Sequence, residues 1–334
     1  MKMLKKSNKI CVLGAGLWGT VLANRMARDH KQVWLWEFFQ RLARNLEEHR
    51  KHPHIPQLEL SPHVRVTADI LAAAAEAEVV LVALPSTVIR PTMRKLRGIA
   101  SHHAHKPWIV SASKCLEPGT LMTVCEVIEE EAPGLAGRVY ALSGPSFARE
   151  VARGVATKLL LAGPLRVAAH RLRETLEGPA LRVALCADRK GVELGGAIKN
   201  VLAIGCGLLD GMKAGANTKA AMITQGVAEM GTLIRARGGK AATIYGLAGL
   251  GDLIATGTSP ESRNRGLGER LGAGATLQQA LKAISTVAEG VESAESAHEL
   301  VAAARVDAPL LEAIWKVVHG GAQPGLVMQA MGFD

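Results

Sequence analysis

Short apolar runs recur through the first half of the chain and are separated by mixed, helix-like stretches. Some runs, such as residues 79–83, are apolar at every position, which is typical of strands covered on both faces. Helical stretches such as residues 20–28 and 166–176 would supply the crossovers. This alternation predicts a Rossmann-type, doubly wound α/β domain with a parallel sheet. The predicted strands are residues 10–13, 33–36, 64–67, 79–83, 109–111, 139–142, 158–161 and 182–185.

The pattern changes after Gly191. From Val192 onward helical periodicity dominates, with glycine-rich breaks at residues 246–251 and 271–274. A chain of 334 residues is long enough for two hydrophobic cores. We therefore expect a nucleotide-type α/β domain over residues 1–190 and an all-helical domain over residues 191–334.

A glycine-rich segment, Gly14-Ala-Gly-Leu-Trp-Gly19, follows the first predicted strand and opens a predicted helix. Its spacing is G-x-G-x-x-G. In this context Gly14 permits a tight turn, Gly16 lets the backbone approach a pyrophosphate, and Gly19 lets the helix pack on the strand. Free N–H groups at the helix N-terminus favour phosphate. The segment predicts a dinucleotide-binding site.

The second predicted strand ends next to Glu37. An acid at this position usually accepts hydrogen bonds from the adenosine ribose and repels a 2′-phosphate, which favours NAD over NADP. Arg41 follows one helical turn later and could instead take a 2′-phosphate. An exposed acid with no role in binding is the simpler alternative.

Lys199 lies alone in an apolar, glycine-spaced run between Val192 and Leu209, with Asn200 beside it. A helix that is apolar around most of its circumference is normally buried, and a buried ammonium group is costly unless it is used or paired. Desolvation lowers the pKa of a lysine, so Lys199 is a candidate proton acceptor. A lysine that reaches solvent, or one in a structural salt bridge, is the alternative.

Other polar groups stand beside predicted turns. Lys114 follows a strand end, where ligands bind in open α/β sheets, and an exposed loop lysine is its alternative. Asp252 ends a glycine-rich turn and is expected to cap the next helix. Ser262-Arg-Asn264 offers a hydroxyl, a guanidinium and an amide near a predicted helix start, a combination suited to a phosphate monoester.

The composition narrows the partners. The formal net charge is +10, but Lys and Arg are dispersed among acids and no basic block carries interleaved aromatics. We therefore expect that the protein does not bind nucleic acid. We favour the interpretation that its positive electrostatic field attracts small phosphorylated molecules. No signal peptide and no integral membrane segment are expected. The five cysteines show no C-x-x-C pair, which suggests reduced thiols and a cytoplasmic protein. The oligomeric state stays open, with a homodimer as one candidate.

A metal site is not expected. The histidines of His102-His-Ala-His105 lie in a polar connection with no cysteine or acid at ligand spacing. A solvated loop is the simpler interpretation of this segment.

Seven phrases, in order and spacing, resemble those of bacterial NAD(P)-dependent glycerol-3-phosphate dehydrogenases. The resemblance runs from about residue 10 to about residue 320. The phrases are Gly14-Ala-Gly-Leu-Trp-Gly-Thr20, Ser113-Lys-Cys-Leu-Glu117, Ser143-Gly-Pro-Ser-Phe-Ala148, Gly196-Ala-Ile-Lys-Asn200, Gly246-Leu-Ala-Gly-Leu-Gly-Asp252, Ser262-Arg-Asn-Arg265 and Val287-Ala-Glu-Gly290.

The resemblance implies reversible hydride transfer between sn-glycerol 3-phosphate and dihydroxyacetone phosphate, which supplies glycerol 3-phosphate for phospholipid synthesis. It also implies a helical second domain like that of 6-phosphogluconate dehydrogenase. Lys199 would be the proton acceptor, with Lys114, Asn200 and Asp252 as catalytic neighbours. The implied substrate-binding residues are Lys114, Gly144, Ser146, Lys199, Asp252, Ser262, Arg263 and Asn264. The implied cofactor-binding residues are Gly14, Gly16, Leu17, Trp18, Gly19, Glu37, Phe38, Lys114, Ala148, Arg263, Val287 and Glu289.

The sequence departs from the family pattern in three places. Leu17 replaces a small polar residue, Glu37-Phe38-Phe39 replaces a stretch that often carries Arg or His, and Cys115 replaces a glycine. Two other functions stay open at this point. A hydroxy-acid or 6-phosphogluconate-type dehydrogenase shares the two-domain plan but not the phrase Ser262-Arg-Asn-Arg265. A nicotinamide-sensing module would bind the cofactor without turnover.

Overall fold

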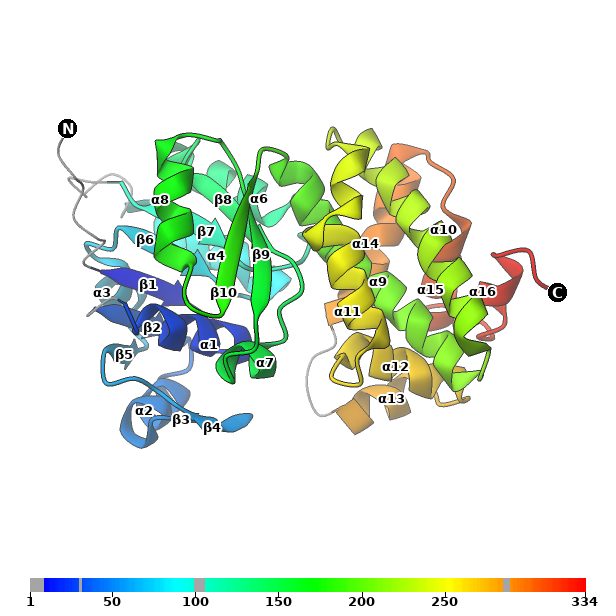
Figure 1. Cartoon of the computed structure of the whole chain (residues 1–334), viewed down its shortest axis with the longest axis horizontal. Coiled ribbons are helices and arrows are strands. Elements are labelled where there is room, and N and C mark those ends of the chain that lie inside the picture. Colours follow the sequence, from blue (N-terminus) through cyan, green and yellow to red (C-terminus); the bar gives the residue numbers. More distant parts are fainter. Residues whose placement is uncertain (1–8, 30–31, 99–105, 285–288) are drawn as a thin grey trace. The chain divides into compact units, whose positions relative to one another are not determined.

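The computed structural model describes residues 9–29, 32–98, 106–284 and 289–334 (Figure 1). The chain divides into two compact units. The first comprises Met1–Ser113, Val124–Leu142 and Ser146–Ala187, and the second comprises Lys114–Thr123, Ser143–Pro145 and Asp188–Asp334. Two short segments that neighbour sheet strands in the sequence therefore group with the helical unit.

The first unit is built on an eight-stranded sheet with the order β10-β9-β8-β7-β6-β1-β2-β5. Strand β1 pairs in parallel with β2 and β6, and the pairs β2–β5, β6–β7, β7–β8 and β9–β10 are also parallel. All eight predicted strands are confirmed, with ends that differ by at most one residue. They are β1 (Ile10–Leu13), β2 (Val33–Trp36), β5 (Val64–Thr67), β6 (Val79–Val82), β7 (Trp108–Ser111), β8 (Val139–Ser143), β9 (Thr157–Ala162) and β10 (Leu181–Cys186).

Helices pack around this sheet (Figure 1), and every residue of β1 and β6 is buried, as continuously apolar strands require. The strands β2 and β5 lie on one side of β1. The strands β6, β7, β8, β9 and β10 lie on its other side, so the strand order reverses between β1 and β6. In doubly wound folds, ligands bind at the strand carboxyl ends beside such a reversal. The helices are α1 (Leu17–Met26), α2 (Gln40–His49), α3 (Ile70–Ala74), α4 (Ser86–Lys95), α6 (Val124–Glu131), α7 (Ala148–Ala152) and α8 (Val167–Leu176).

Two features of the first unit differ from the sequence-based expectation. Helix α1 begins at Leu17 rather than at residue 20, because Gly16 already serves as its N-cap. A two-stranded antiparallel hairpin, β3 (Lys51–His52) and β4 (Ile55–Glu59), was not predicted. Its strands are short and carry several polar residues, so they lack a clear two-residue apolar alternation.

The second unit is helical and is organised around α9 (Arg189–Gly211), which contacts α10, α11, α12, α14 and α15 (Figure 1). Among the described residues α9 is the one helix long and apolar enough to cross a membrane, and its most apolar window is entirely buried inside this unit. The remaining elements are α10 (Gly215–Ala236), a 3-10 turn (Ala241–Tyr245), a π-helical turn (Leu247–Gly251), α11 (Asp252–Thr258), α12 (Arg263–Gly272), α13 (Leu277–Ile284), α14 (Glu289–Ala304), α15 (Pro309–Val318) and α16 (Leu326–Gln329).

Glycines bring α9 and α12 into backbone contact. A Cβ atom on Gly207 would lie 1.9 Å from the carbonyl oxygen of Arg265, and one on Gly268 would lie 2.0 Å from the carbonyl oxygen of Ile204. Neither position tolerates a side chain without moving one helix. This close approach holds the start of α12 beside the middle of α9.

Candidate functional site

The glycine-rich segment of the first unit has the geometry of a phosphate-binding turn. Gly14 has a φ of +104°, and a Cβ there would lie 2.4 Å from the carbonyl oxygen of Ala83. A Cβ on Gly19 would lie 1.9 Å from the carbonyl oxygen of Gly14, so both positions require glycine. A Cβ on Gly16 meets nothing within 4 Å. Gly16, the exposed N-cap of α1, therefore leaves room for a phosphate group at the helix N-terminus.

Residues after β2 extend this surface. Glu37 is half-buried, and its Oε1 accepts a hydrogen bond from the backbone N–H of Phe39 at 3.0 Å. Phe38 is 60 % exposed, and Lys95 Nζ lies over its ring, 5.3 Å from the centroid. Leu17 and Trp18 open α1 and are half-buried. An exposed aromatic face next to a carboxylate can hold an adenosine group.

The second unit gathers three polar side chains around Lys199. Its Nζ lies 3.3 Å from Oδ1 of Asp252 and donates to the Thr256 hydroxyl at 2.9 Å. Lys114 Nζ donates to the other carboxylate oxygen of Asp252 at 2.7 Å and to the carbonyl oxygen of Gly144 at 2.8 Å. The Asp252 carboxylate therefore lies between the ammonium groups of Lys114 and Lys199, and Lys199 is buried together with Asp252.

Burial and charge shift the pKa values of this cluster. Burial lowers the pKa of Lys199 to about 8, an effect that Asp252 opposes and Lys114 reinforces. Burial alone would raise the pKa of Asp252, but Lys114 and then Lys199 outweigh it and lower that pKa. A lysine with a pKa near 8 can both accept and release a proton near neutral pH.

Small residues permit this arrangement. A Cβ on Gly195 would lie 3.1 Å from the carbonyl oxygen of Ala248, and one on Gly196 would lie 2.8 Å from Oγ of Ser143. Both glycines lie about one helical turn before Lys199 on α9. The glycine-rich π-helical turn and the segment around Gly144 can therefore approach the same stretch of α9.

Asn200 and Asn264 connect three elements of the second unit. Nδ2 of Asn264 donates to Oδ1 of Asn200 at 3.0 Å, and Oδ1 of Asn264 accepts from the backbone N–H of Gly290 at 3.0 Å. Nδ2 of Asn200 lies 3.5 Å from the carbonyl oxygen of Lys114. Both amides are buried and hold α9, α12 and α14 in register.

The start of α12 agrees with the predicted helix start. Ser262 is the N-cap, and its Oγ accepts from the backbone N–H of Arg265 at 3.2 Å. Arg263, the first residue of this helix, is exposed. By contrast, the expectation that Asp252 caps a helix is wrong. Gly251 is the N-cap of α11, and the Asp252 carboxylate faces the two lysines.

The remaining predicted residues belong to other elements. Ser146 and Ala148 belong to the first unit. Ser146 precedes α7, and Ala148 is the first residue of that helix. Glu289 is exposed at the start of α14. Val287 lies outside the described residues, as do His102, His103 and His105. Among the described residues no group of His, Cys, Asp and Glu could hold a metal ion.

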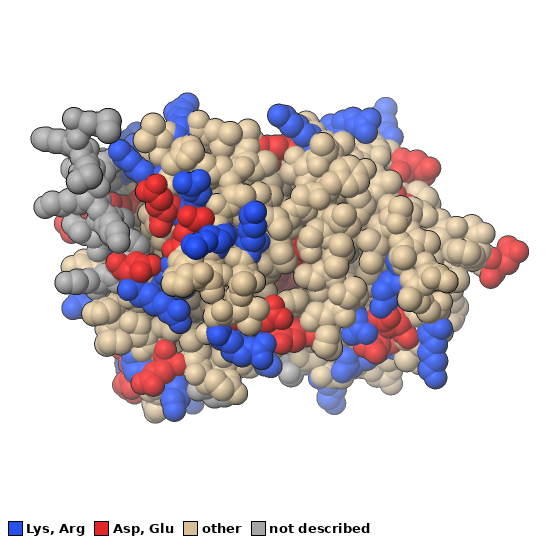
Figure 2. All heavy atoms as spheres, viewed as in Figure 1, with Lys and Arg blue, Asp and Glu red and all other residues tan. Residues whose placement is uncertain are grey.

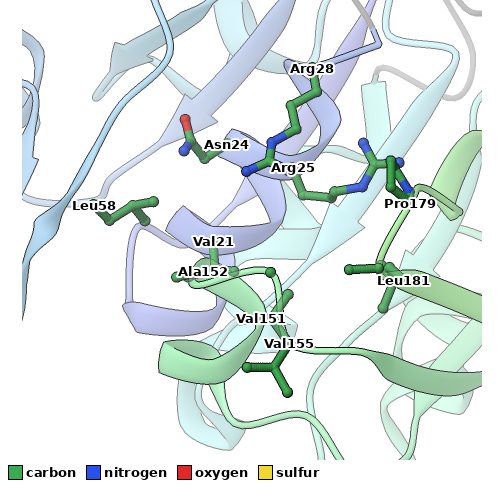
Figure 3. Close-up of a pocket in the computed structure, with 12 residues that line it drawn as sticks. Val21, Asn24, Arg25, Arg28, Leu58, Val151, Ala152, Val155, Pro179 and Leu181 are labelled. Atoms are coloured by element: carbon green, nitrogen blue, oxygen red, sulfur yellow. The ribbon is translucent and has the colours of Figure 1, made fainter.

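A further pocket in the first unit contains none of the predicted site residues. It lies between α1, α7, Leu58 of β4 and the start of β10 (Figure 3). Arg25, which lines it, is bonded to Asp29 at 2.7 Å and to the carbonyl oxygen of Glu177. Both terminal nitrogens of its guanidinium are thus bonded to protein groups, and the pocket is a poor candidate for the chemistry.

Thr256 was not predicted as a site residue. Its only signal in the sequence is its position one helical turn after Asp252, which places both side chains on one face of α11.

Charge on the face of the molecule in Figure 2 is mixed, with basic and acidic side chains close together. That face carries no continuous basic field of the kind that nucleic acid requires.

The comparisons agree with this geometry. The N-terminal family model of NAD-dependent glycerol-3-phosphate dehydrogenase matches residues 9–168, and the C-terminal model matches residues 188–329. The chain is 40 % identical over 324 residues to glycerol-3-phosphate dehydrogenase [NAD(P)+] of Nitratidesulfovibrio vulgaris strain DP4, covering 97 % of each chain. It is 41 % identical over 317 residues to that of Trichlorobacter lovleyi, covering 93 % of each.

A solved structure gives the same result. The crystal structure of glycerol-3-phosphate dehydrogenase from Coxiella burnetii superposes with a TM-score of 0.89 at 33 % identity and covers 98 % of both chains. The resemblance found in the sequence and both parts of the predicted fold class are thereby confirmed. The chain belongs to the NAD-dependent glycerol-3-phosphate dehydrogenase family.

Proposed function

We propose that this protein interconverts sn-glycerol 3-phosphate and dihydroxyacetone phosphate with a nicotinamide dinucleotide, and that Lys199 transfers the proton. The observation that carries this proposal is the buried Lys199 ammonium, bonded to Thr256 and next to Asp252. A bound nicotinamide would take or give the hydride. The remaining tasks, which are binding, orientation and proton transfer, fall to side chains of this chain.

Oxidation of the secondary alcohol requires the hydroxyl proton to leave as the hydride departs from carbon. Neutral Lys199 has a lone pair for that proton, while its own N–H groups can donate to Thr256 and Asp252. In the reverse direction protonated Lys199 returns the proton to the developing alkoxide. Lys114, held by Asp252 and by the carbonyl oxygen of Gly144, is proposed to bind a substrate oxygen.

The phosphate end of the substrate is assigned to the start of α12. Arg263 is exposed there, and the helix N-terminus favours an anion. Ser262 and Asn264 would orient the group from the same turn. Gly144 and Ser146 are proposed as further substrate contacts.

The cofactor is assigned to the carboxyl end of β1 in the first unit. Gly14, Gly16 and Gly19 would hold the pyrophosphate, and Leu17 and Trp18 follow in the same turn. Glu37 and Phe38 would receive the adenosine. The carboxylate of Glu37 favours NAD over NADP, although Arg41 lies close in sequence. Ala148, Lys114, Arg263, Val287 and Glu289 complete the proposed set.

This assignment makes residues 1–190 the cofactor domain and residues 191–334 the substrate domain. The product would serve phospholipid synthesis in the cytoplasm, and no metal is needed for the proposed chemistry. We also propose that the protein binds no nucleic acid, and a homodimer is one candidate for its assembly.

The test is turnover followed at the nicotinamide absorbance with glycerol 3-phosphate and with glycerol. We expect activity with the phosphorylated substrate and very little with glycerol. Arg263→Ala should raise KM for glycerol 3-phosphate by about tenfold or more, because a charge-assisted hydrogen bond contributes about 1.5–3 kcal/mol. Arg270→Ala, on the same helix, is the matched control and should leave KM unchanged. Equal activity with both substrates would contradict the proposal.

A further inference from the structure

The β3–β4 hairpin is fastened to the glycine-rich segment by one histidine. His52 is only 6 % exposed, and its Nε2 lies 3.1 Å from the carbonyl oxygen of Ala15. Its Nδ1 accepts a hydrogen bond from the backbone N–H of His54 at 3.2 Å. Only the neutral tautomer with the proton on Nε2 satisfies both contacts.

The surroundings of His52 favour this neutral ring. Burial lowers the pKa of His52; the bond to Ala15 opposes that shift and the neighbouring His54 adds to it. A second anchor, Asn24 on α1, donates to the carbonyl oxygen of Glu59 at 3.2 Å and accepts from the backbone N–H of Ser61 at 2.7 Å. The hairpin is therefore held on α1 independently of His52.

The carbonyl group that His52 contacts shares a peptide unit with the N–H group of Gly16. A trans peptide is planar, so its C=O and N–H bonds point in opposite directions. The carbonyl oxygen of Ala15 also accepts a hydrogen bond from the buried Oγ1 of Thr20 at 3.2 Å. The two donors therefore turn the N–H of Gly16 away from His52, at an N-cap where a Cβ would meet nothing within 4 Å.

We propose that His52 is a positioning residue for cofactor binding, which orients the Ala15–Gly16 peptide so that the Gly16 N–H faces the pyrophosphate of the dinucleotide. This inference rests on the proposed dinucleotide site. His52 does not touch the cofactor in this account; it acts through the peptide that does. Its removal should weaken NADH binding and leave the proton-transfer groups of the second unit unaffected.

Two substitutions separate the two nitrogens of His52. The amide of glutamine can place a donor near the position of Nε2, so His52→Gln should keep the bond to Ala15. The shorter asparagine can keep only the contact near Nδ1. His54→Gln is the matched control, because it changes an exposed histidine of the same hairpin and keeps the backbone N–H.

The experiment measures the NADH dissociation constant by titration, together with kcat for glycerol 3-phosphate oxidation at saturating cofactor. We expect His52→Asn to weaken NADH binding about tenfold, as the loss of one buried hydrogen bond implies. His52→Gln and His54→Gln should stay within about twofold of wild type, and kcat should stay within about twofold in all variants. Equal affinities for His52→Gln and His52→Asn would overturn the proposal.

Wild type provides a measurement that does not depend on any variant folding. Ring ¹⁵N chemical shifts of His52 in the NADH complex should show the tautomer protonated on Nε2. The other tautomer would overturn the proposal. If the wild-type protein does not bind NADH at all, the proposed dinucleotide site is wrong. That outcome is distinct from one in which wild type binds NADH and the His52 variants bind it with the same affinity, which would refute only the role of His52.

Discussion

Nζ of Lys199 lies 3.3 Å from Oδ1 of Asp252, and both side chains are buried. The same carboxylate is bonded to Lys114 through its other oxygen at 2.7 Å. Asp252 therefore keeps a cationic partner when Lys199 is neutral. This shared carboxylate explains how a buried lysine can change its protonation state without leaving an unpaired buried acid.

The first prediction concerns the pH dependence of turnover. The pKa of Lys199 is lowered to about 8, and oxidation requires its neutral form. The kcat for glycerol 3-phosphate oxidation should rise with pH and level off above that pKa. The kcat for dihydroxyacetone phosphate reduction requires the protonated form and should fall through the same range.

The neighbours of Lys199 should move this profile in opposite directions. Asp252 raises the pKa of Lys199 and Lys114 lowers it. The inflection should therefore shift to lower pH in Asp252→Asn and to higher pH in Lys114→Met, measured on the residual activity. Shifts in the same direction would contradict the electrostatic account.

A second prediction concerns the contact between α9 and α12. Gly268→Ala places a Cβ 2.0 Å from the carbonyl oxygen of Ile204 and should reduce the free energy of unfolding by about 1–3 kcal/mol. Because α12 carries Asn264, KM for glycerol 3-phosphate should rise as well.

Gly266→Ala is the matched control on the same helix. Its Cβ would lie 3.4 Å from Nη1 of the flexible Arg270 side chain, and alanine should stabilise the helix by up to about 1 kcal/mol. Chemical denaturation of both variants is the measurement. Similar losses in the two would show that the backbone contact is unimportant.

A third prediction separates folding from cofactor binding at two neighbouring glycines. Gly14 has a φ of +104° and no space for a Cβ, so Gly14→Ala should lower Tm. Gly16 has a φ of −68° and open space, so Gly16→Ala should fold normally but obstruct the pyrophosphate. Thermal unfolding and NADH titration on both variants test this. Unchanged NADH affinity in Gly16→Ala would place the cofactor elsewhere.

A fourth prediction concerns cofactor preference. Wild type should use NAD(H) at least as well as NADP(H), and Glu37→Ser should shift the ratio of kcat/KM values toward NADP(H), because it removes charge repulsion. Glu48→Ser, on the exposed part of α2, controls for the change in net charge. Low ionic strength is needed because salt screens the effect. A ratio that responds equally to both substitutions would contradict the role of Glu37.

The fold was predictable because it depends on local patterns. Continuously apolar runs such as residues 79–83 indicate strands covered on both faces. The glycine spacing from Gly14 to Gly19 indicates a tight turn between a strand and a helix. Lys199 was conspicuous because a lone charge in an apolar helix is costly. These signals need no knowledge of distant contacts.

The partners of Lys199 depend on contacts between distant segments. The local sequence alone led to the interpretation of Asp252 as a helix cap, and only the family resemblance implied a catalytic role beside Lys199. In the structure its carboxylate contacts Lys114 and Lys199. Thr256 carries no signal beyond its spacing from Asp252. The position of His52 against Ala15 depends on how a short, weakly patterned hairpin packs on α1.

The measurement that tests the central claim most directly is kcat for glycerol 3-phosphate oxidation by Lys199→Met, together with its NADH dissociation constant. If Lys199 transfers the proton, kcat should fall by at least about 10²-fold, which is the lower end of general acid–base contributions. NADH affinity should remain near the wild-type value. A variant that retains most of the wild-type kcat would contradict the account and remove Lys199 from the mechanism.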